Sequence, residues 1–117
     1  MKEEERICKE YESEIKNGDK LVIFISEGCP YCEEAKKKLM EMEIPEKMIE
    51  NMPNEVVEIS ISECSDVVNK YEIEGTPTFM RIVDGKIVGR VDGLDEEGIK
   101  WLVTMKVEKK SKEVTNS

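Results

Sequence analysis

The chain has 117 residues, of which 38% are charged, and a formal net charge of -9. A chain of this length can bury one core and fold as a single domain without a disulfide to hold it. Its negative charge disfavours contact with phosphate backbones and with anionic lipid, which excludes nucleic acid as an expected partner.

The N-terminal segment, residues 3–16, is predicted to be an amphipathic helix. Apolar side chains recur in it at helical spacing, and Asn17-Gly18-Asp19 ends the pattern. The segment is too charged to contain the apolar core of a signal peptide, and no apolar run in the chain approaches the roughly 18 residues of a membrane span. We therefore expect a cytoplasmic protein that does not contact a membrane.

A continuous apolar run, LVIFI at residues 21–25, comes next and is typical of a central strand that helices cover on both faces. From Glu33 to about Met42 the apolar residues fall on one face, and glutamates stand four positions before lysines, which predicts a second helix. Pro45 and Pro53 then interrupt regular structure. The strand leads directly into a pair of cysteines at the start of this helix.

The second half of the chain contains three predicted strands and two helices. Residues 57–61 alternate between apolar and polar side chains, and Ser62 is placed to cap a short helix that ends near Tyr71. Residues 78–83 and 86–91 are strand-like and flank Asp84-Gly85, a strong hairpin signal. A last helix is expected over residues 95–106.

The order of these elements predicts an α/β fold. Strands joined through helices run parallel, whereas the final hairpin is antiparallel, so the expected sheet is mixed, mainly four-stranded and sandwiched between helices. We expect one domain at residues 1–107, with an extra N-terminal helix at 1–18 and a core at 19–106. Residues 108–117 are expected to form a polar C-terminal tail.

The segment GCPYC, residues 28–32, places two thiols three positions apart between a buried strand and a helix. The first sulfur lies beside the unpaired N–H groups of the helix start, whose partial positive charge favours a thiolate. Cys29 is therefore predicted to be the nucleophile. Cys32, one turn further along the helix, is predicted to be the thiol that resolves a mixed disulfide.

The neighbours of the two cysteines modify this picture. Pro30 suits the first helical turn, where an N–H group would be unpaired anyway, and Tyr31 is expected to shape the rim of the site. Negative charges close to the sulfur oppose its ionisation, so only moderate acidity is expected. The carboxylates concerned are those of Glu27, Glu33 and Glu34.

Two other roles for the cysteine pair are weighed against redox exchange. The chain has no histidine, so a zinc site would have to recruit Cys8 and Cys64, whose positions on apolar helical faces are explained more simply by burial in the core. A structural disulfide is disfavoured in a reducing compartment, where bridges tend to be catalytic or transient. We therefore expect no metal site, and Cys8 and Cys64 as inert core residues, with a regulatory or second disulfide left open.

A second constellation, GTPTF at residues 75–79, lies between a predicted helix and the hairpin. Together with CPYC after an apolar strand and with Asp84-Gly85-Lys86 leading to Gly93, it resembles the thioredoxin-like superfamily over about residues 19–106. The resemblance implies a thioredoxin fold in which Pro77 is a cis proline facing the CxxC pair. It also implies that an extended substrate docks on the backbone of Thr76. The expected substrate-binding residues are Pro30, Tyr31, Thr76 and Pro77.

The sequence shares features with two branches of this superfamily. CPYC resembles the dithiol glutaredoxin active site, but glutaredoxins usually place a lysine shortly before the first cysteine to bind a glutathione carboxylate, and Glu27 stands near that place. Thioredoxins have CGPC, a tryptophan before the first cysteine and a buried aspartate in the preceding strand, where this chain has Gly28 and Ile23. The C-terminal half is more similar to thioredoxin. Proton transfer during the resolving step is thus left to water or to Glu27.

These features predict a thiol-disulfide oxidoreductase that reduces disulfides in proteins or small molecules through the Cys29/Cys32 dithiol. The resemblance implies no bound cofactor, and an external reductant that is a flavin- and NADPH-dependent reductase in preference to glutathione. Two alternatives remain: a glutathione-dependent glutaredoxin, and a non-catalytic thioredoxin-like module that binds partners. We expect a monomer whose partners are disulfide-containing molecules and a reductase.

Overall fold

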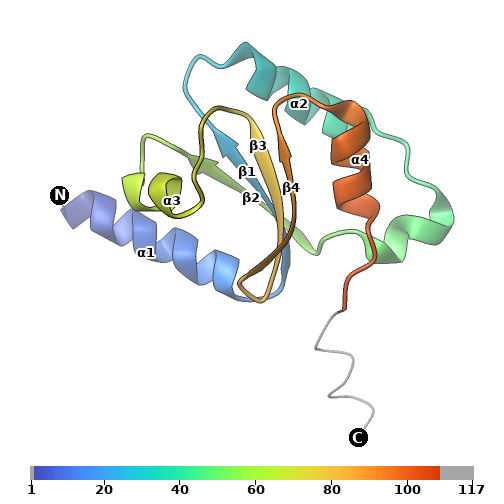
Figure 1. Ribbon diagram of the computed structural model, residues 1–117, viewed down its shortest axis with the longest axis horizontal. Helices are drawn as coiled ribbons and strands as arrows, with labels where there is room; N and C mark the ends of the chain where they lie inside the picture. Colours follow the sequence, from blue (N-terminus) through green and yellow to red (C-terminus); the bar gives the residue numbers. More distant parts are fainter. Residues whose placement is uncertain (1, 109–117) are drawn as a thin grey trace, which may run out of the picture.

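The computed structural model describes residues 2–108 of the chain (Figure 1). The tail expected at 108–117 lies outside the described residues, except for Glu108. Within residues 2–108, no helix has both the length and the apolar character that crossing a membrane requires. The elements in chain order are α1 (Lys2–Lys16), β1 (Asp19–Ile25), α2 (Pro30–Glu41), the 3₁₀ helix η1 (Glu46–Asn51), β2 (Glu55–Ser60), α3 (Ser65–Lys70), β3 (Thr78–Val83), β4 (Lys86–Asp92) and α4 (Glu96–Thr104).

The strands form one mixed sheet in the order β2-β1-β3-β4. β1 pairs with β2 in parallel and with β3 in the antiparallel sense, and β3 and β4 form an antiparallel hairpin. The hairpin turn is Asp84-Gly85, whose φ angles of 50° and 86° are both positive, as a tight two-residue turn requires. The predicted α/β fold, with one parallel pair and a C-terminal hairpin, is confirmed.

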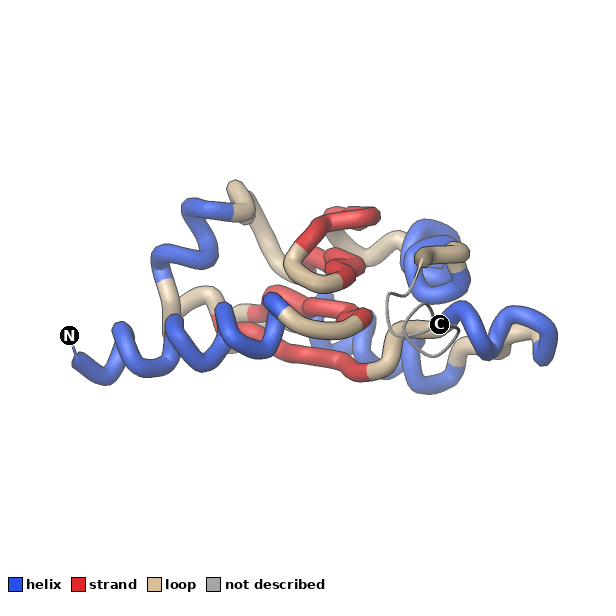
Figure 2. The backbone as a smooth tube through the Cα atoms, turned by 90° about the horizontal axis from the view of Figure 1, so that it is seen from below, coloured by secondary structure: helices blue, strands red, loops and turns tan. Residues whose placement is uncertain are grey.

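Helices cover both faces of the sheet, as the unbroken apolar run of β1 predicts. One core packs α1 and α3 against Val22 and Phe24, and the other packs α2 and α4 against Leu21 and Ile23. Figure 2 shows the strands between these two groups of helices. Because successive side chains of a strand point to opposite faces, the same short run of β1 contributes to both cores.

Several helix boundaries differ from the predicted ones. α3 begins at Ser65 with Cys64 as its N-cap residue, so the prediction that Ser62 caps it is wrong; a turn in which the Glu63 N–H donates to the Ser60 carbonyl at 3.0 Å takes up the preceding residues. α4 starts after Asp95, whose carboxylate accepts a hydrogen bond from the Gly98 N–H at 3.0 Å. The short helix η1 has no counterpart in the sequence analysis, because its six residues are too few to show a periodic pattern.

Cys8 and Cys64 form a disulfide, so the expectation that they are inert core thiols is wrong. The expectation of burial is right: Cys8 is 6% and Cys64 0% exposed, in the core between α1, α3 and the sheet. The two residues are 56 positions apart in the sequence and meet in the core that α1 and α3 form with the sheet. The disulfide therefore ties the N-terminal helix to the start of α3.

Two polar contacts between the same elements support this tie. Tyr11 donates a hydrogen bond to Glu63, and burial together with this bond raises the pKa of Tyr11 to about 12. Glu4 accepts hydrogen bonds from the backbone N–H and the hydroxyl of Ser65, both at 3.0 Å, and these bonds lower the pKa of Glu4. At neutral pH the phenol is therefore a donor and the Glu4 carboxylate an acceptor, as both contacts require.

Removing the disulfide is expected to lower stability. The variant Cys8→Ala/Cys64→Ala should lose about 2–4 kcal/mol of unfolding free energy, because a crosslink over a long loop restricts the unfolded chain. Urea unfolding of the oxidised proteins measures this difference. In a strong reductant the parent should approach the variant, since reduction removes the same covalent tie. Equal urea midpoints for the variant and the oxidised parent would contradict a stabilising role.

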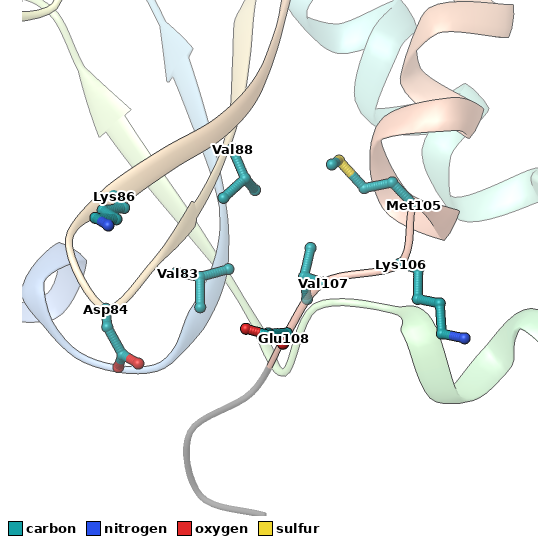
Figure 3. Close-up of a pocket in the computed structure, with 8 residues that line it drawn as sticks. All are labelled: Val83, Asp84, Lys86, Val88, Met105, Lys106, Val107 and Glu108. Carbon is teal, nitrogen blue, oxygen red and sulfur yellow. The ribbon is translucent and has the colours of Figure 1, made fainter.

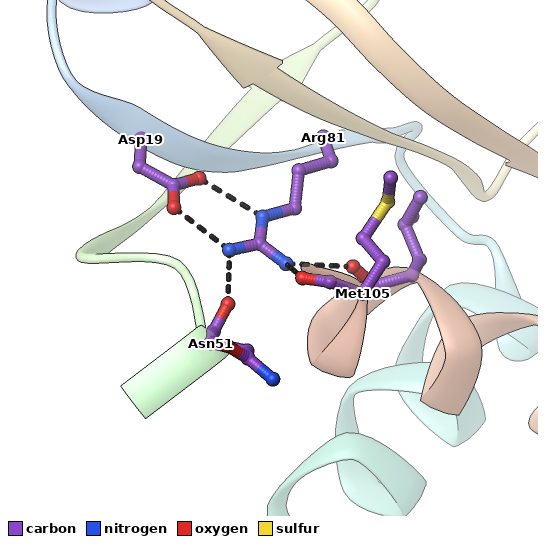
Figure 4. A network of polar contacts seen from close by, with 5 residues as sticks. Asp19, Asn51, Arg81 and Met105 are labelled. Carbon is purple, nitrogen blue, oxygen red and sulfur yellow. Dashed lines mark hydrogen bonds and ion pairs between the residues drawn. The ribbon is translucent and has the colours of Figure 1, made fainter. Parts of the chain in front are cut away.

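A buried ion pair at the start of β1 connects the sheet to η1 and α4 (Figure 4). The side chains of Arg81 and Asp19 are 0% and 2% exposed and share two hydrogen bonds, Nε to Oδ1 at 2.9 Å and Nη2 to Oδ2 at 2.7 Å. The other guanidinium N–H groups donate to the carbonyls of Asn51, Leu102 at 3.0 Å and Met105 at 3.2 Å. The charge is thus buried with its hydrogen-bonding capacity used, as burial of a guanidinium requires.

Candidate active site

The cysteine pair lies at the junction of β1 and α2. β1 ends at Ile25, and a loop through Gly28, which has a φ of 65°, brings the chain to Cys29. Glycine adopts this left-handed conformation at no steric cost, so it suits the sharp change of direction. Cys29 is the N-cap residue of α2, and Pro30 follows in the first turn, where the N–H that proline lacks is not needed. The strand-to-helix junction predicted around CPYC is therefore present.

The structure holds Cys29 and Cys32 as a disulfide, with their Cα atoms 5.2 Å apart. The Cys29 Sγ accepts a hydrogen bond of 3.1 Å from the backbone N–H of Cys32, one of the N–H groups that the helix start leaves without an intrahelical partner. Cys32 is 2% exposed, whereas Cys29 is only partly buried. A disulfide arriving from solvent can therefore reach Cys29 but not Cys32.

The loop before β3 faces the cysteine pair. The Thr76–Pro77 peptide bond is cis, as the resemblance implies. The carbonyl oxygen of Thr76 lies 3.8 Å from the Cys29 Sγ, and the hydroxyl oxygen of Thr76 lies 3.5 Å from the same sulfur. The Pro77 carbonyl accepts a hydrogen bond of 2.8 Å from the Gly93 N–H, which fixes the loop to the segment after β4. The fold thus brings Thr76 and Pro77 to Cys29.

Ser26 also belongs to the site, although the sequence analysis gives it no role. Its hydroxyl lies 2.7 Å from the Thr76 hydroxyl, which in turn contacts the Cys29 sulfur. The two hydroxyl groups form a short chain that can donate a hydrogen bond to a thiolate. No motif marks Ser26, because only the pairing of β1 with β3 places it beside the Thr76 loop.

A depression of about 570 Å³ opens beside Cys29, lined by the segment from the end of β1 to the first turn of α2 and by Ser60 at the end of β2. The charged side chains among its described lining residues are those of Glu27 and Glu33. Tyr31, between the two cysteines in the chain, is 65% exposed, in keeping with a place on the rim. The surroundings of the exposed sulfur are therefore acidic.

Two further expectations concern the interior beneath the thiols. Ile23, which takes the place of the buried aspartate of thioredoxins, is 1% exposed and packs in the core under α2 and α4.

Within residues 2–108, no cluster of histidine, cysteine, aspartate or glutamate side chains is arranged to hold a metal ion. Cys8 and Cys64 lie in the core on the opposite face of the sheet from α2, away from the CPYC segment. Of the four cysteines, Cys29 and Cys32 are therefore the two that lie at this site.

A second depression, of about 490 Å³, lies at the turn end of the β3–β4 hairpin (Figure 3). Val83, Val88 and Val107 line it from β3, β4 and the segment after α4. None of the described residues that line it is a cysteine or a predicted site residue. The predicted site residues lie instead at the other end of the sheet, around Cys29.

Comparison with known proteins agrees with this geometry. The chain matches the family model described as Thioredoxin over residues 4–106. It is 35% identical over 89 residues to a thioredoxin of Echinococcus granulosus, an alignment that covers 74% of this chain and 78% of that protein. It is 32% identical over 99 residues to the mitochondrial thioredoxin-3 of Saccharomyces cerevisiae, covering 80% of this chain and 73% of that protein.

Solved structures show the same fold. The crystal structure of oxidised mitochondrial thioredoxin 3 from Saccharomyces cerevisiae superposes with a TM-score of 0.65 at 22% identity, covering 82% of this chain and 87% of that one. The X-ray structure of Fasciola hepatica thioredoxin also gives a TM-score of 0.65 at 22% identity, covering 88% and 94%. With a disulfide at the CPYC segment, the chain belongs to the thioredoxin family and is a thiol-disulfide oxidoreductase.

Proposed function

We propose that Cys29 is the nucleophile and Cys32 the resolving thiol of a dithiol that reduces disulfides in proteins or small molecules. The Cys29 thiolate attacks one sulfur of the substrate disulfide, and the other substrate sulfur leaves as a thiolate and takes up a proton. The Cys32 thiol then loses its proton and attacks the Cys29 sulfur of the mixed disulfide. The second substrate sulfur leaves, so two electrons have passed to the substrate and the Cys29–Cys32 disulfide remains.

The difference in exposure between the two sulfurs carries this assignment. Cys29 borders the open depression, whereas Cys32 is 2% exposed and can react only with a sulfur already bound to Cys29. The N–H of Cys32 and the hydroxyl of Thr76, at 3.1 Å and 3.5 Å, are donors aimed at the Cys29 sulfur and would stabilise its thiolate. These contacts favour Cys29 as the ionised partner.

Substrate docking is assigned to the loop opposite the sulfurs. The Thr76 carbonyl, 3.8 Å from the Cys29 Sγ, is an acceptor for an N–H group of an extended substrate chain. Pro77 shapes this loop, and Pro30 and Tyr31, which follow Cys29 in the chain, are exposed. A substrate held along Thr76 would present its disulfide to Cys29 while its flanking residues cover Pro30 and Tyr31.

Regeneration of the dithiol is assigned to an external flavin- and NADPH-dependent reductase. No cofactor is proposed to bind to this chain, and the cycle is proposed to run in the cytoplasm. The carboxylates of Glu27 and Glu33 beside Cys29 would repel the carboxylates of glutathione, which disfavours it as the donor. The protein is proposed to work as a monomer.

The donor can be tested by coupling insulin reduction to NADPH consumption. A flavin-dependent thioredoxin reductase should be compared with glutathione plus glutathione reductase. The concentration of the oxidised protein should be the same in both assays. Rapid turnover is expected with a thioredoxin reductase and slow turnover with glutathione, and the Cys29→Ser variant should give the background rate with either donor. Faster recycling by glutathione would move the protein to the glutaredoxin type.

A further inference from the structure

We propose that the site prefers disulfides flanked by positively charged groups, and that Glu27 and Glu33 are the residues that select them. This inference rests on the function proposed above, with Cys29 as the attacking sulfur. Membership of the thioredoxin family gives the activity but not the preferred substrate. The proposal adds that preference, which is for cationic disulfides.

The two carboxylates stand on either side of Cys29 along the chain and border the same depression. Glu27 lies in the loop after β1, Glu33 lies in the first turn of α2, and both line the same depression as Cys29. The Glu33 side chain is 80% exposed, and Glu27 is exposed as well, so both can contact an incoming molecule. The described residues that line the depression include no lysine or arginine.

Cations nearby leave most of this negative charge in place. Lys36 approaches Glu33 to 3.9 Å, but its ammonium group lies closer to Glu58, at 3.4 Å, and is shared between the two carboxylates. Among the described residues, no ion pair involves Glu27. The rim of the site therefore keeps a net negative charge.

The segment that carries Thr76 also contains an exposed carboxylate. Glu74 is exposed and precedes by two positions Thr76, whose carbonyl lies 3.8 Å from the Cys29 sulfur. Carboxylates thus line the depression from the β1–α2 loop and from α2, and a third, that of Glu74, is exposed on the segment that leads to Thr76. A chain with a net charge of -9 adds a long-range attraction for cations in the same direction.

The consequence for the reaction is a ranking of substrates by charge. Sulfur exchange brings the groups next to the substrate disulfide within reach of the depression, so a cation there is attracted and an anion repelled. At an ionic strength of about 0.01 M, two carboxylates at about 10 Å change the rate about threefold per unit of substrate charge. A change from one positive to one negative charge beside the disulfide should therefore change the rate about sevenfold through Glu27 and Glu33.

Small disulfides of similar size and different charge test the proposal. The pre-reduced full-length protein is mixed with cystamine, bis(hydroxyethyl) disulfide or dithiodiglycolate, which are cationic, neutral and anionic. Acid quenching, alkylation and mass spectrometry of the peptide that holds Cys29 and Cys32 then give the rate of oxidation. The neutral disulfide provides the reference rate within each variant, which cancels any change in the reactivity of the thiolate itself.

The variant Glu27→Gln/Glu33→Gln is compared with a matched control, Glu5→Gln/Glu12→Gln, which removes the same charge from α1 on the opposite face of the sheet. Cystamine carries two positive charges and dithiodiglycolate two negative ones, a difference of four units. In low salt the cation-to-anion rate ratio should therefore fall about 50-fold in the first variant and stay at the parent value in the control. Added salt should shrink the ratio of the parent toward that of the first variant.

Each other outcome overturns a specific statement. An unchanged ratio in Glu27→Gln/Glu33→Gln, or an equal fall in the control, would refute selection by these two residues while leaving the role of Cys29 intact. Failure of the neutral disulfide to oxidise the Cys29–Cys32 pair in the parent protein would refute the proposed function, and the selectivity with it.

Discussion

Replacing Cys29 with serine is expected to lower kcat/KM for disulfide reduction by more than about 1000-fold, the scale of loss when a covalent nucleophile is removed. A serine hydroxyl does not ionise at neutral pH, so no nucleophile remains at the exposed position while Cys32 stays buried at 2% exposure. Serine is a favoured N-cap residue, so α2 should begin as before and the loss should be chemical. Insulin reduction coupled to NADPH oxidation measures the rate, and circular dichroism checks the fold.

The companion variant Cys32→Ser separates attack from resolution. Its Cys29 can still form a mixed disulfide, but no second thiol releases it, so substrate should accumulate covalently on the protein and be visible in the intact mass. If Cys29→Ser reduced insulin as fast as the parent, Cys29 would not be the nucleophile. If instead Cys29→Ser trapped substrate and Cys32→Ser did not, the two roles would have to be exchanged.

Local patterns in the sequence were sufficient to predict the elements that position this site. The run LVIFI, with no polar position, indicates a strand covered on both faces, and β1 is the strand that shares its side chains between two cores. Asp84-Gly85 fixes a hairpin because these residues tolerate positive φ. A CxxC pair between a buried strand and a helix then has to lie at a helix start. Each of these signals is contained within a few neighbouring residues.

The features that sequence analysis missed depend on contacts between distant segments. Cys8 and Cys64 each fit an apolar helical face, and nothing in either neighbourhood distinguishes a buried thiol from half of a disulfide. Arg81 interrupts the apolar pattern of β3, but its partners come from β1, η1 and the end of α4. Ser26 becomes part of the site only through the Thr76 loop. Such contacts are fixed by tertiary packing, which the pattern of apolar residues within one segment does not reveal.

The sequence analysis correctly predicted acidic surroundings for the sulfur, but not which glutamates form them. Three glutamates near the CxxC pair were expected to oppose the thiolate, and two of them, Glu27 and Glu33, line the depression beside Cys29. Glu34 does not line it and lies instead 3.8 Å from Lys38 on the same helix. One position along a helix turns a side chain by about 100°, so neighbouring residues face different surroundings. The sequence therefore identifies the charges, and the helix geometry decides which of them a substrate meets.

Replacing Arg81 with methionine is expected to cost about 3–5 kcal/mol of unfolding free energy, a large part of the stability of a small domain. The substitution puts an unbranched apolar side chain in place of the arginine in β3. The Asp19 side chain, which is 2% exposed, then loses the two hydrogen bonds that the guanidinium donates to its carboxylate. Urea unfolding at neutral pH measures the loss. Arg6→Met is the matched control, because the Arg6 side chain is 57% exposed on α1 and its removal should change stability far less.

A double-mutant cycle shows whether the penalty arises from removing one charge of the pair while the other stays buried. Asp19→Leu alone leaves a buried guanidinium, and Arg81→Met alone leaves a buried carboxylate, whereas the double variant leaves neither. The double variant should therefore lose less than the sum of the two single losses, by about 2 kcal/mol. Strictly additive losses would mean that the two side chains stabilise the fold independently. Because the pair lies at the start of β1 and Cys29 follows its end, the folded fraction of each variant should still reduce disulfides at the parental rate.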